Sequence, residues 1–363
     1  MIPVEYYTLI YNLVLSFVII MTTLHLFKYT NDEIISSSIL NLKSFIIVSV
    51  VILFIGLRDP WGNWRYFGDT SHYSQMFEEI NTVNAKEIND IGFVFFMKIC
   101  ARFLNLQGFY FLCACLYVIP VYFTLKKWFA DKAFYALAVY VTAMSFWSFG
   151  INGVRNGLAA SFFIFSLQFV NKKVIMIAIM LVAISFHKSL ILPVLAFFAA
   201  YYIKDTKLLM IIWLFAIVFA FFFGDNIEIF VQNTFKIMGL DDDRTVTYYD
   251  NEFDGEEIIR SFRFDFILYS GFTIWLGYYY VIKKKFNDAI YIQLLNMYII
   301  ANTVWVILIY AAYTNRTAYL SWFIMPVVMI YPLLKANLLQ RQYQKIAWMI
   351  IGSLTFALLM EYK

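Results

Sequence analysis

Basic side chains that could bind an anion interrupt or border the long apolar runs of this sequence. Arg155 lies in INGVRNGLAASFF, His187 and Lys188 lie in ISFHKSLILP, and Arg316 lies in AYTNRTAYLSW. Arginine stays charged at all physiological pH values and can bind two phosphate oxygens at once. Placing an arginine at the centre of a membrane helix costs about 2.5–3.5 kcal/mol on insertion scales, which favours a functional reason for its presence. The residue types therefore predict a site for a phosphate or pyrophosphate group.

A second group of polar residues lies in RDPWGNWRYFGDTSHY, residues 58–73, directly after an apolar run. Asp69 and His187 have side chains that can accept a proton, so either could act as a general base. The aromatic side chains of this stretch suit sugar rings or the headgroup region of a bilayer. The candidate catalytic residues are Arg155, His187, Arg316 and Asp69, and the candidate substrate contacts are Arg58, Asp59, Arg65, His72, Tyr73, Lys188 and Asn315. The alternative is that each basic residue is a separate anchor at the membrane interface.

The composition decides what kind of fold must position these residues. The chain is 62% hydrophobic and only 14% charged, whereas soluble domains contain about 25% charged residues. Its apolar runs are continuous, which disfavours a β-barrel and favours helices that satisfy their own backbone in lipid. We predict an all-α polytopic membrane protein of about twelve transmembrane helices, near residues 5–27, 38–57, 108–128, 133–149, 151–170, 173–187, 189–203, 207–223, 264–282, 289–311, 317–334 and 345–361.

The distribution of charge predicts the orientation of these helices. On the twelve-helix arrangement one side gathers the lysine-rich turns, including Lys283, Lys284 and Lys285, and the other side is net negative. The positive-inside rule assigns the lysine-rich side to the cytoplasm. Both termini and two long loops then lie outside: residues 58–107, with an amphipathic helix at Ile91–Phe103, and the acidic residues 224–263. Residues 1–363 form a single integral membrane domain in this prediction.

Metal and thiol chemistry have weaker support in the sequence. The DDD of residues 241–243 lies in the acidic loop, and DNEFDG at residues 250–255 lacks the glutamate that would complete a calcium loop. The pair Asp69 and His72 has no further ligand cluster beside it. Three cysteines without a CxxC pair read as small apolar residues. We expect no cofactor and no bound metal.

The sequence resembles the Wzy-type polysaccharide polymerases, in particular the EpsG-like branch. The resemblance rests on GLRD and GDTSHY after the second predicted helix, DIGFVFF at residues 90–96, NGVRNGLAASFF at residues 152–163 and FHKSLI at residues 186–191, with NR at residues 315–316 as a weaker match. Members of the family usually place the G-x-D element close behind the R-D pair. Here PWGNWRYF separates Arg58 from Asp69, so the pattern alone does not fix their relative placement.

The resemblance implies a bacterial inner-membrane glycosyltransferase, similar in fold to the GT-C superfamily and to O-antigen ligases, with its active site facing the periplasm. Such enzymes transfer a glycan from undecaprenyl pyrophosphate onto the terminal sugar of another lipid-linked repeat unit. They resemble metal-independent enzymes in which arginines replace a divalent cation. The implied partners are the lipid-linked oligosaccharide, the bilayer, and a chain-length regulator and flippase of the same pathway, with no role for nucleic acid.

Two alternatives remain open on the sequence. An O-antigen ligase would use the same donor with a lipid A-core acceptor. A flippase for lipid-linked oligosaccharides would belong to another class, and proton-driven carriers usually need carboxylates at mid-membrane. The predicted helix interiors contain almost none, and the polar residues gather on one predicted face. Both features favour a one-sided enzyme.

The predicted orientation has a direct test in a background without native cysteines. With the outer membrane permeabilised, Asp242→Cys should react with a membrane-impermeant thiol reagent, because residue 242 lies in the acidic outer loop. Lys284→Cys should resist the reagent, because residue 284 lies in a cytoplasmic turn. The reverse labelling pattern would invert the orientation and place the candidate site in the cytoplasm.

Overall fold

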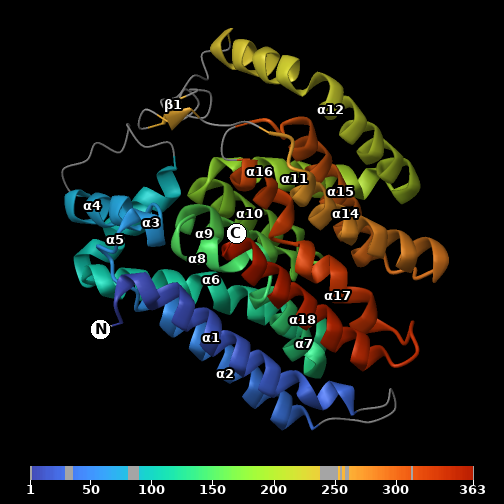
Figure 1. Ribbon diagram of the computed structural model, residues 1–363, viewed down its shortest axis with the longest axis horizontal. Helices are drawn as coiled ribbons and strands as arrows, with labels where there is room; N and C mark the ends of the chain where they lie inside the picture. Colours follow the sequence, from blue (N-terminus) through green and yellow to red (C-terminus); the bar gives the residue numbers. More distant parts are fainter. Residues whose placement is uncertain are drawn as a thin grey trace. The chain divides into compact units, whose positions relative to one another are not determined.

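The protein is helical throughout almost all of the chain for which a structure is given. A computed structural model describes residues 2–28, 36–80, 90–237, 252–253, 256–257, 261–311 and 314–362 (Figure 1). Its strands, β1 (Glu252–Phe253) and β2 (Glu256–Glu257), pair antiparallel and contain two residues each. The predicted all-α class is therefore confirmed. The DDD of residues 241–243 lies outside the described residues, as does most of DNEFDG.

Seven helical spans in the described part of the chain are long and apolar enough to cross a membrane, judged by length and composition. They are Val4–Phe27, Ser37–Gly56, Leu106–Val141, Thr206–Gly224, Ala289–Ile307, Thr314–Lys335 and Gln342–Glu361, and shorter apolar helices cover Val154–Leu167, Lys173–Phe186 and Lys188–Tyr202. This pattern is that of a polytopic membrane protein. The number of twelve spans and the two outer loops stay predictions.

The chain divides into two compact units, and the first comprises residues 1–191 and 330–363. Its long helix α6 (Leu106–Phe129) packs against α2 and α9, and α10 packs against α9. Helices α1 and α2 lie side by side (Figure 1). The other elements are α1 (Val4–Thr23), η1 (Leu24–Phe27), α2 (Ser37–Gly56), α3 (Trp64–Phe67), α4 (Thr70–Glu79), α5 (Ile91–Phe103), η2 (Ala130–Lys132), α7 (Ala133–Val141), α8 (Met144–Ile151), α9 (Val154–Leu167), α10 (Lys173–Phe186), η3 (Lys188–Leu190) and α18 (Gln342–Glu361).

Two breaks divide this part of the first unit, one inside a predicted helix and one near the predicted boundary between the helices 133–149 and 151–170. The helix predicted over 133–149 is interrupted between α7 and α8, where Ala143 has an extended backbone with ψ of 140°. A second break at Asn152 and Gly153 separates α8 from α9. Helices α8 and α9 lie close together next to this break, as Gly157 shows: a Cβ there would lie 2.3 Å from the Phe149 carbonyl oxygen. Hydrophobicity alone could not show the break at Ala143, since apolar residues continue on both sides of it.

The second compact unit comprises residues 192–329. Helix α12 (Thr206–Ile237) lies along α15 (Ala289–Ile307), and α16 (Thr314–Trp322) packs on the same helix. The unit also contains most of α11 (Ile191–Tyr202), α14 (Phe264–Tyr278), the π-helix η4 (Tyr279–Lys283) and the start of α17 (Met325–Lys335). Because α12 continues to Ile237, the first part of the predicted outer loop 224–263 is helical instead of irregular.

A buried polar network holds four helices of the second unit together: α12, α14, α15 and α16. The Asn302 carboxamide accepts a hydrogen bond from Trp213 Nε1 at 2.7 Å and donates to Ser270 Oγ and Ser321 Oγ at 3.1 and 2.9 Å. Trp322 Nε1 donates to the same Ser270 oxygen at 2.8 Å. Interhelical hydrogen bonds of this kind contribute about 0.6 kcal/mol each on average in membrane proteins. The network fixes the register of α16, the helix that carries Arg316.

Candidate active site

Arg155 lies in the first turn of α9, directly after the break at Asn152 and Gly153. Its Nη1 donates to Asp90 Oδ2 at 2.9 Å, and its Nε donates to the Tyr73 hydroxyl at 3.2 Å. The guanidinium carbon also lies 5.3 Å from the centre of the Tyr73 ring. Within the described residues Nη2 makes no hydrogen bond. The side chain is held on two sides and is 12% exposed, so one edge of the fork can still receive a ligand.

Asp90 joins Arg155 to the histidine segment. It is the residue before α5, and its side chain is only 2% exposed. Besides Arg155, its carboxylate lies 3.4 Å from His187 Nδ1, and its Oδ1 accepts from the Lys188 backbone N–H at 3.3 Å. His187 ends α10 in an extended conformation, which turns the chain so that both contacts reach one carboxylate. Four segments far apart in sequence therefore meet here: α4, the start of α5, the start of α9 and the end of α10.

Asp90 carries a negative charge in this setting. Burial alone would raise the pKa of its carboxyl group, but the interactions with His187, the Arg155 guanidinium and the Lys188 amide lower the pKa to about 2. The carboxylate is thus ionised at any physiological pH. It opposes the charge of Arg155 and faces Nδ1 of His187.

The GDT segment docks on the break between α8 and α9. Gly68 has a positive φ of 53°, and a Cβ at this position would lie 2.3 Å from the Asn152 side chain. The Asn152 carboxamide oxygen accepts from the Asp69 backbone N–H at 2.9 Å, and Thr70 Oγ1 donates to the Ile151 carbonyl at 2.9 Å. Asp69, partly exposed, is close enough for its charge to stabilise the Arg155 guanidinium. Docking therefore brings Asp69 to the arginine from a distant part of the sequence.

Arg58 supports this docking from inside the protein. The residue is fully buried, and its guanidinium donates to Thr70 Oγ1 and to the Ile55 and Ile151 carbonyls. It also lies 4.3 Å from the centre of the Tyr110 ring. The inserted PWGNWRYF folds back through α3, so Thr70 returns to Arg58 despite the longer spacing. The alternative that Arg58 is an anchor at the membrane interface is therefore wrong, because its guanidinium is surrounded by protein groups.

The remaining predicted contacts lie in different places. The Asp59 carboxylate accepts from the Trp61 N–H at 2.9 Å, which makes it part of a local turn. Arg65 and His72 are exposed on α3 and α4, and Lys188 is exposed beside His187. Within the described residues no group of three or more histidine, cysteine, aspartate or glutamate side chains could hold a metal ion. The contacts of Asp90 join the predicted catalytic residues Arg155 and His187.

The sequence matches the model of the EpsG family over residues 42–362, which is most of the chain. The chain belongs to the EpsG family. No curated protein and no solved structure matches it. Membership suggests a function like that of an exopolysaccharide or O-antigen polymerase, and the recognised motifs GDTSHY, DIGFVFF, NGVRNG and FHKSLI are the segments that meet around Arg155.

Arg316 and Asn315 of this EpsG-family protein lie on α16, in the second compact unit. Asn315 is exposed and Arg316 is partly exposed. That Arg316 shares a cavity with Arg155 and His187 stays a prediction.

The sequence did not predict one residue of the site, Asp90, and predicted a different role for another, Tyr73. Asp90 was not among the candidate residues, although it begins the DIGFVFF motif and precedes a helix. Tyr73 was expected to touch substrate, whereas its hydroxyl accepts a hydrogen bond from Arg155. The need to balance the charge of Arg155 could have identified Asp90. A buried arginine needs an acidic partner, and Asp90 is the acidic residue of the DIGFVFF motif.

Docking of the GDT segment can be tested at Gly68. Gly68→Ala should strain a backbone with positive φ and push the new methyl into Asn152, which would displace Asp69 from Arg155. We expect polymer formation in cells to fall severalfold or more while the protein still inserts in the membrane. The control is Gly352→Ala, where nothing lies within 4 Å of the added methyl. Equal polymer from both variants would show that the docking does not matter for function.

Proposed function

We propose that this protein is a polysaccharide polymerase of the bacterial inner membrane. It transfers a glycan from undecaprenyl pyrophosphate onto the terminal sugar of another lipid-linked repeat unit at the periplasmic face. The observation that carries the proposal is the Asp90 carboxylate, which holds Arg155 and His187 at one place. Family membership supports the reaction class, and the site supplies the groups that this chemistry requires.

Arg155 would stabilise the leaving group. Breaking the bond between the sugar C1 and the phosphate oxygen leaves negative charge on the pyrophosphate, and a preorganised cation lowers the barrier by meeting that charge. The Asp90 and Tyr73 contacts fix two edges of the guanidinium and leave Nη2 for phosphate oxygens. Asp90 cancels part of the charge of Arg155, so the proposal needs further cations. Lys188 at the same end of α10 is exposed, and Arg316 is the predicted second arginine.

His187 would accept the proton of the attacking hydroxyl. A carboxylate at Nδ1 keeps the proton on that nitrogen and leaves Nε2 as the base, in the way a buried aspartate orients a catalytic histidine. The 3.4 Å separation is longer than a good hydrogen bond, but such contacts often tighten only when substrate is bound. The oxygen of the acceptor sugar then bonds to the donor C1, undecaprenyl pyrophosphate leaves, and the proton resides on His187.

Asp69 would bind the acceptor sugar. Its carboxylate acts on the Arg155 guanidinium, and its backbone is fixed through Asn152. A carboxylate accepts hydrogen bonds from two sugar hydroxyls, so it can orient the acceptor without joining the proton transfer. This assignment brings donor phosphate and acceptor sugar to the same arginine.

Replacement of Arg155 by lysine distinguishes a catalytic role of this arginine from a role as an anchor at the membrane interface. Arg155→Lys keeps the charge but loses the planar fork, and the loss of one such donor typically lowers a rate on the order of a hundredfold. In a polymerase-null strain we expect surface polysaccharide with single repeat units and no ladder on gels. The control is Arg102→Lys, an exposed arginine in the last turn of α5. A normal ladder from Arg155→Lys would contradict the proposed role, and loss of even single repeat units would favour a ligase.

Chelation tests the metal-independent mechanism. Purified protein given lipid-linked repeat units should form polymer at the same rate with and without EDTA, because arginine supplies the positive charge. Loss of activity in EDTA with recovery on added magnesium or manganese would overturn this. Such a result would direct attention to Asp69 and His72 or to the acidic residues 241–243.

A further inference from the structure

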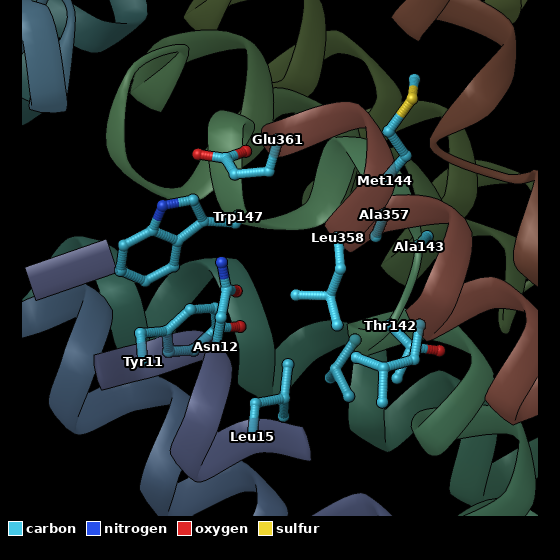
Figure 2. A pocket seen from close by; sticks show the side chains of 12 residues that line it. Tyr11, Asn12, Leu15, Thr142, Ala143, Met144, Trp147, Ala357, Leu358 and Glu361 are labelled. Atoms are coloured by element: carbon cyan, nitrogen blue, oxygen red, sulfur yellow. The ribbon is translucent and has the colours of Figure 1, made fainter. Parts of the chain in front are cut away.

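A small pocket lies in the first compact unit, between the middle of α1, the junction of α7 and α8, and the end of α18 (Figure 2). Its cavity volume is about 20 Å³, and among its lining residues are Tyr11, Asn12, Trp147 and Glu361. A cavity needs roughly 10–15 Å³ to hold one water-sized group. The pocket therefore accommodates a hydroxyl or a similar small polar group at its inner end.

Two buried side chains that line this pocket carry polar atoms with no hydrogen-bond partner among the described residues. Tyr11 is 1% exposed and Trp147 is 7% exposed, and their rings stack with centroids 3.8 Å apart. Neither the Tyr11 hydroxyl nor Trp147 Nε1 forms a hydrogen bond with any residue that the structure describes. A buried polar group left unsatisfied costs about 1–3 kcal/mol. A guest that both accepts from the indole N–H and bonds to the phenol would remove that cost.

The opening of the pocket carries further groups for hydroxyls. In Figure 2 the Trp147 indole, the Asn12 carboxamide and the Glu361 carboxylate lie toward the same end of the pocket. Asn12 Nδ2 donates to the Tyr362 hydroxyl at 3.2 Å, which leaves the carboxamide oxygen and its second N–H available. Glu361 is exposed and acts on Tyr11 through its charge. Indole N–H, carboxamide, carboxylate and phenol together are the donors and acceptors that a vicinal diol requires.

The pocket connects to the candidate active site through packed side chains. Trp147 lies on α8, and the next helix along the chain begins with the turn that holds Arg155. Tyr7, one turn before Tyr11, has its ring 6.5 Å from Trp147 and 5.4 Å from Phe67, the residue that precedes Gly68. Buried aromatic side chains thus link the docked GDT segment to the residues that line the pocket.

We propose that this pocket is an outer sugar subsite, which binds hydroxyl groups of a glycan residue beyond the one that reacts. The inference rests on the proposed polymerase function and goes beyond it by assigning a second place where the glycan is held. It binds the glycan and takes no part in breaking or forming bonds. The subsite therefore affects substrate affinity and the length of the product.

The test uses Trp147→Phe, which removes the indole N–H and keeps an aromatic ring, and Asn12→Ala at the opening. The matched control is Trp348→Phe, an exposed tryptophan on α18. Full-length purified proteins are assayed with lipid-linked repeat units for KM, kcat and product length on gels. Loss of a hydrogen bond worth about 1.4 kcal/mol should raise KM about tenfold. We expect this rise with kcat within about twofold, and a shorter ladder, in both pocket variants.

Asn12→Ala serves where Trp147→Phe does not fold, since Asn12 is only partly buried. Unchanged KM and ladder in the pocket variants would overturn the subsite and show that the pocket holds ordered water only. A fall in kcat without a change in KM would also overturn it. If wild type and Trp348→Phe form no polymer from lipid-linked repeat units, the proposed function itself fails, and the subsite fails with it.

Discussion

A carboxylate as deeply buried as that of Asp90 remains ionised only where cations and hydrogen-bond donors surround it. Arg155, His187 and the Lys188 amide supply them from helices that are otherwise separate in the sequence. The dependence is mutual, because Arg155 is itself mostly buried and needs a negative partner. Removing one member of such a buried pair typically costs about 3–5 kcal/mol. This requirement explains why the end of α10 and the starts of α9 and α5 meet at one point.

The remainder of the first unit serves to hold that meeting point in place. Gly68 allows the chain to turn so closely against Asn152 that any side chain there would clash. Arg58 anchors the turn from beneath through Thr70 and the Ile151 carbonyl. A buried arginine that bonds to carbonyl oxygens in this way stabilises the irregular backbone at the end of α8. Arg58 therefore shapes the backbone of the site, and Arg155 is the arginine that we propose binds the ligand.

Much of this arrangement follows from the sequence, and the parts that do not have identifiable causes. Continuous apolar runs predicted the helical membrane class, and the pattern of Ile91–Phe103 predicted α5 with its bounds. The break at Ala143 escaped prediction because hydrophobicity does not change across it, whereas the break at Asn152 lies within a few residues of the predicted boundary between the helices 133–149 and 151–170. Asp90 escaped because its importance lies in long-range contacts to Arg155 and His187, and one sequence does not show which distant residues pair. The insertion before Gly68 left the position of Asp69 open, and only the folded path of α3 returns that segment to Arg58.

The central claim is that Asp90 makes Arg155 and His187 one catalytic unit, and a double-mutant cycle tests it most directly. Single-turnover rates of sugar transfer would be measured for wild type, Asp90→Asn, His187→Gln and the double variant, all in the same lipid. Because Asp90 orients His187 as well as Arg155, the loss in the double variant should be clearly smaller than the product of the two single losses. Fully additive losses, with the rate of the double variant equal to the product of the two single effects, would contradict the account and make the two residues independent.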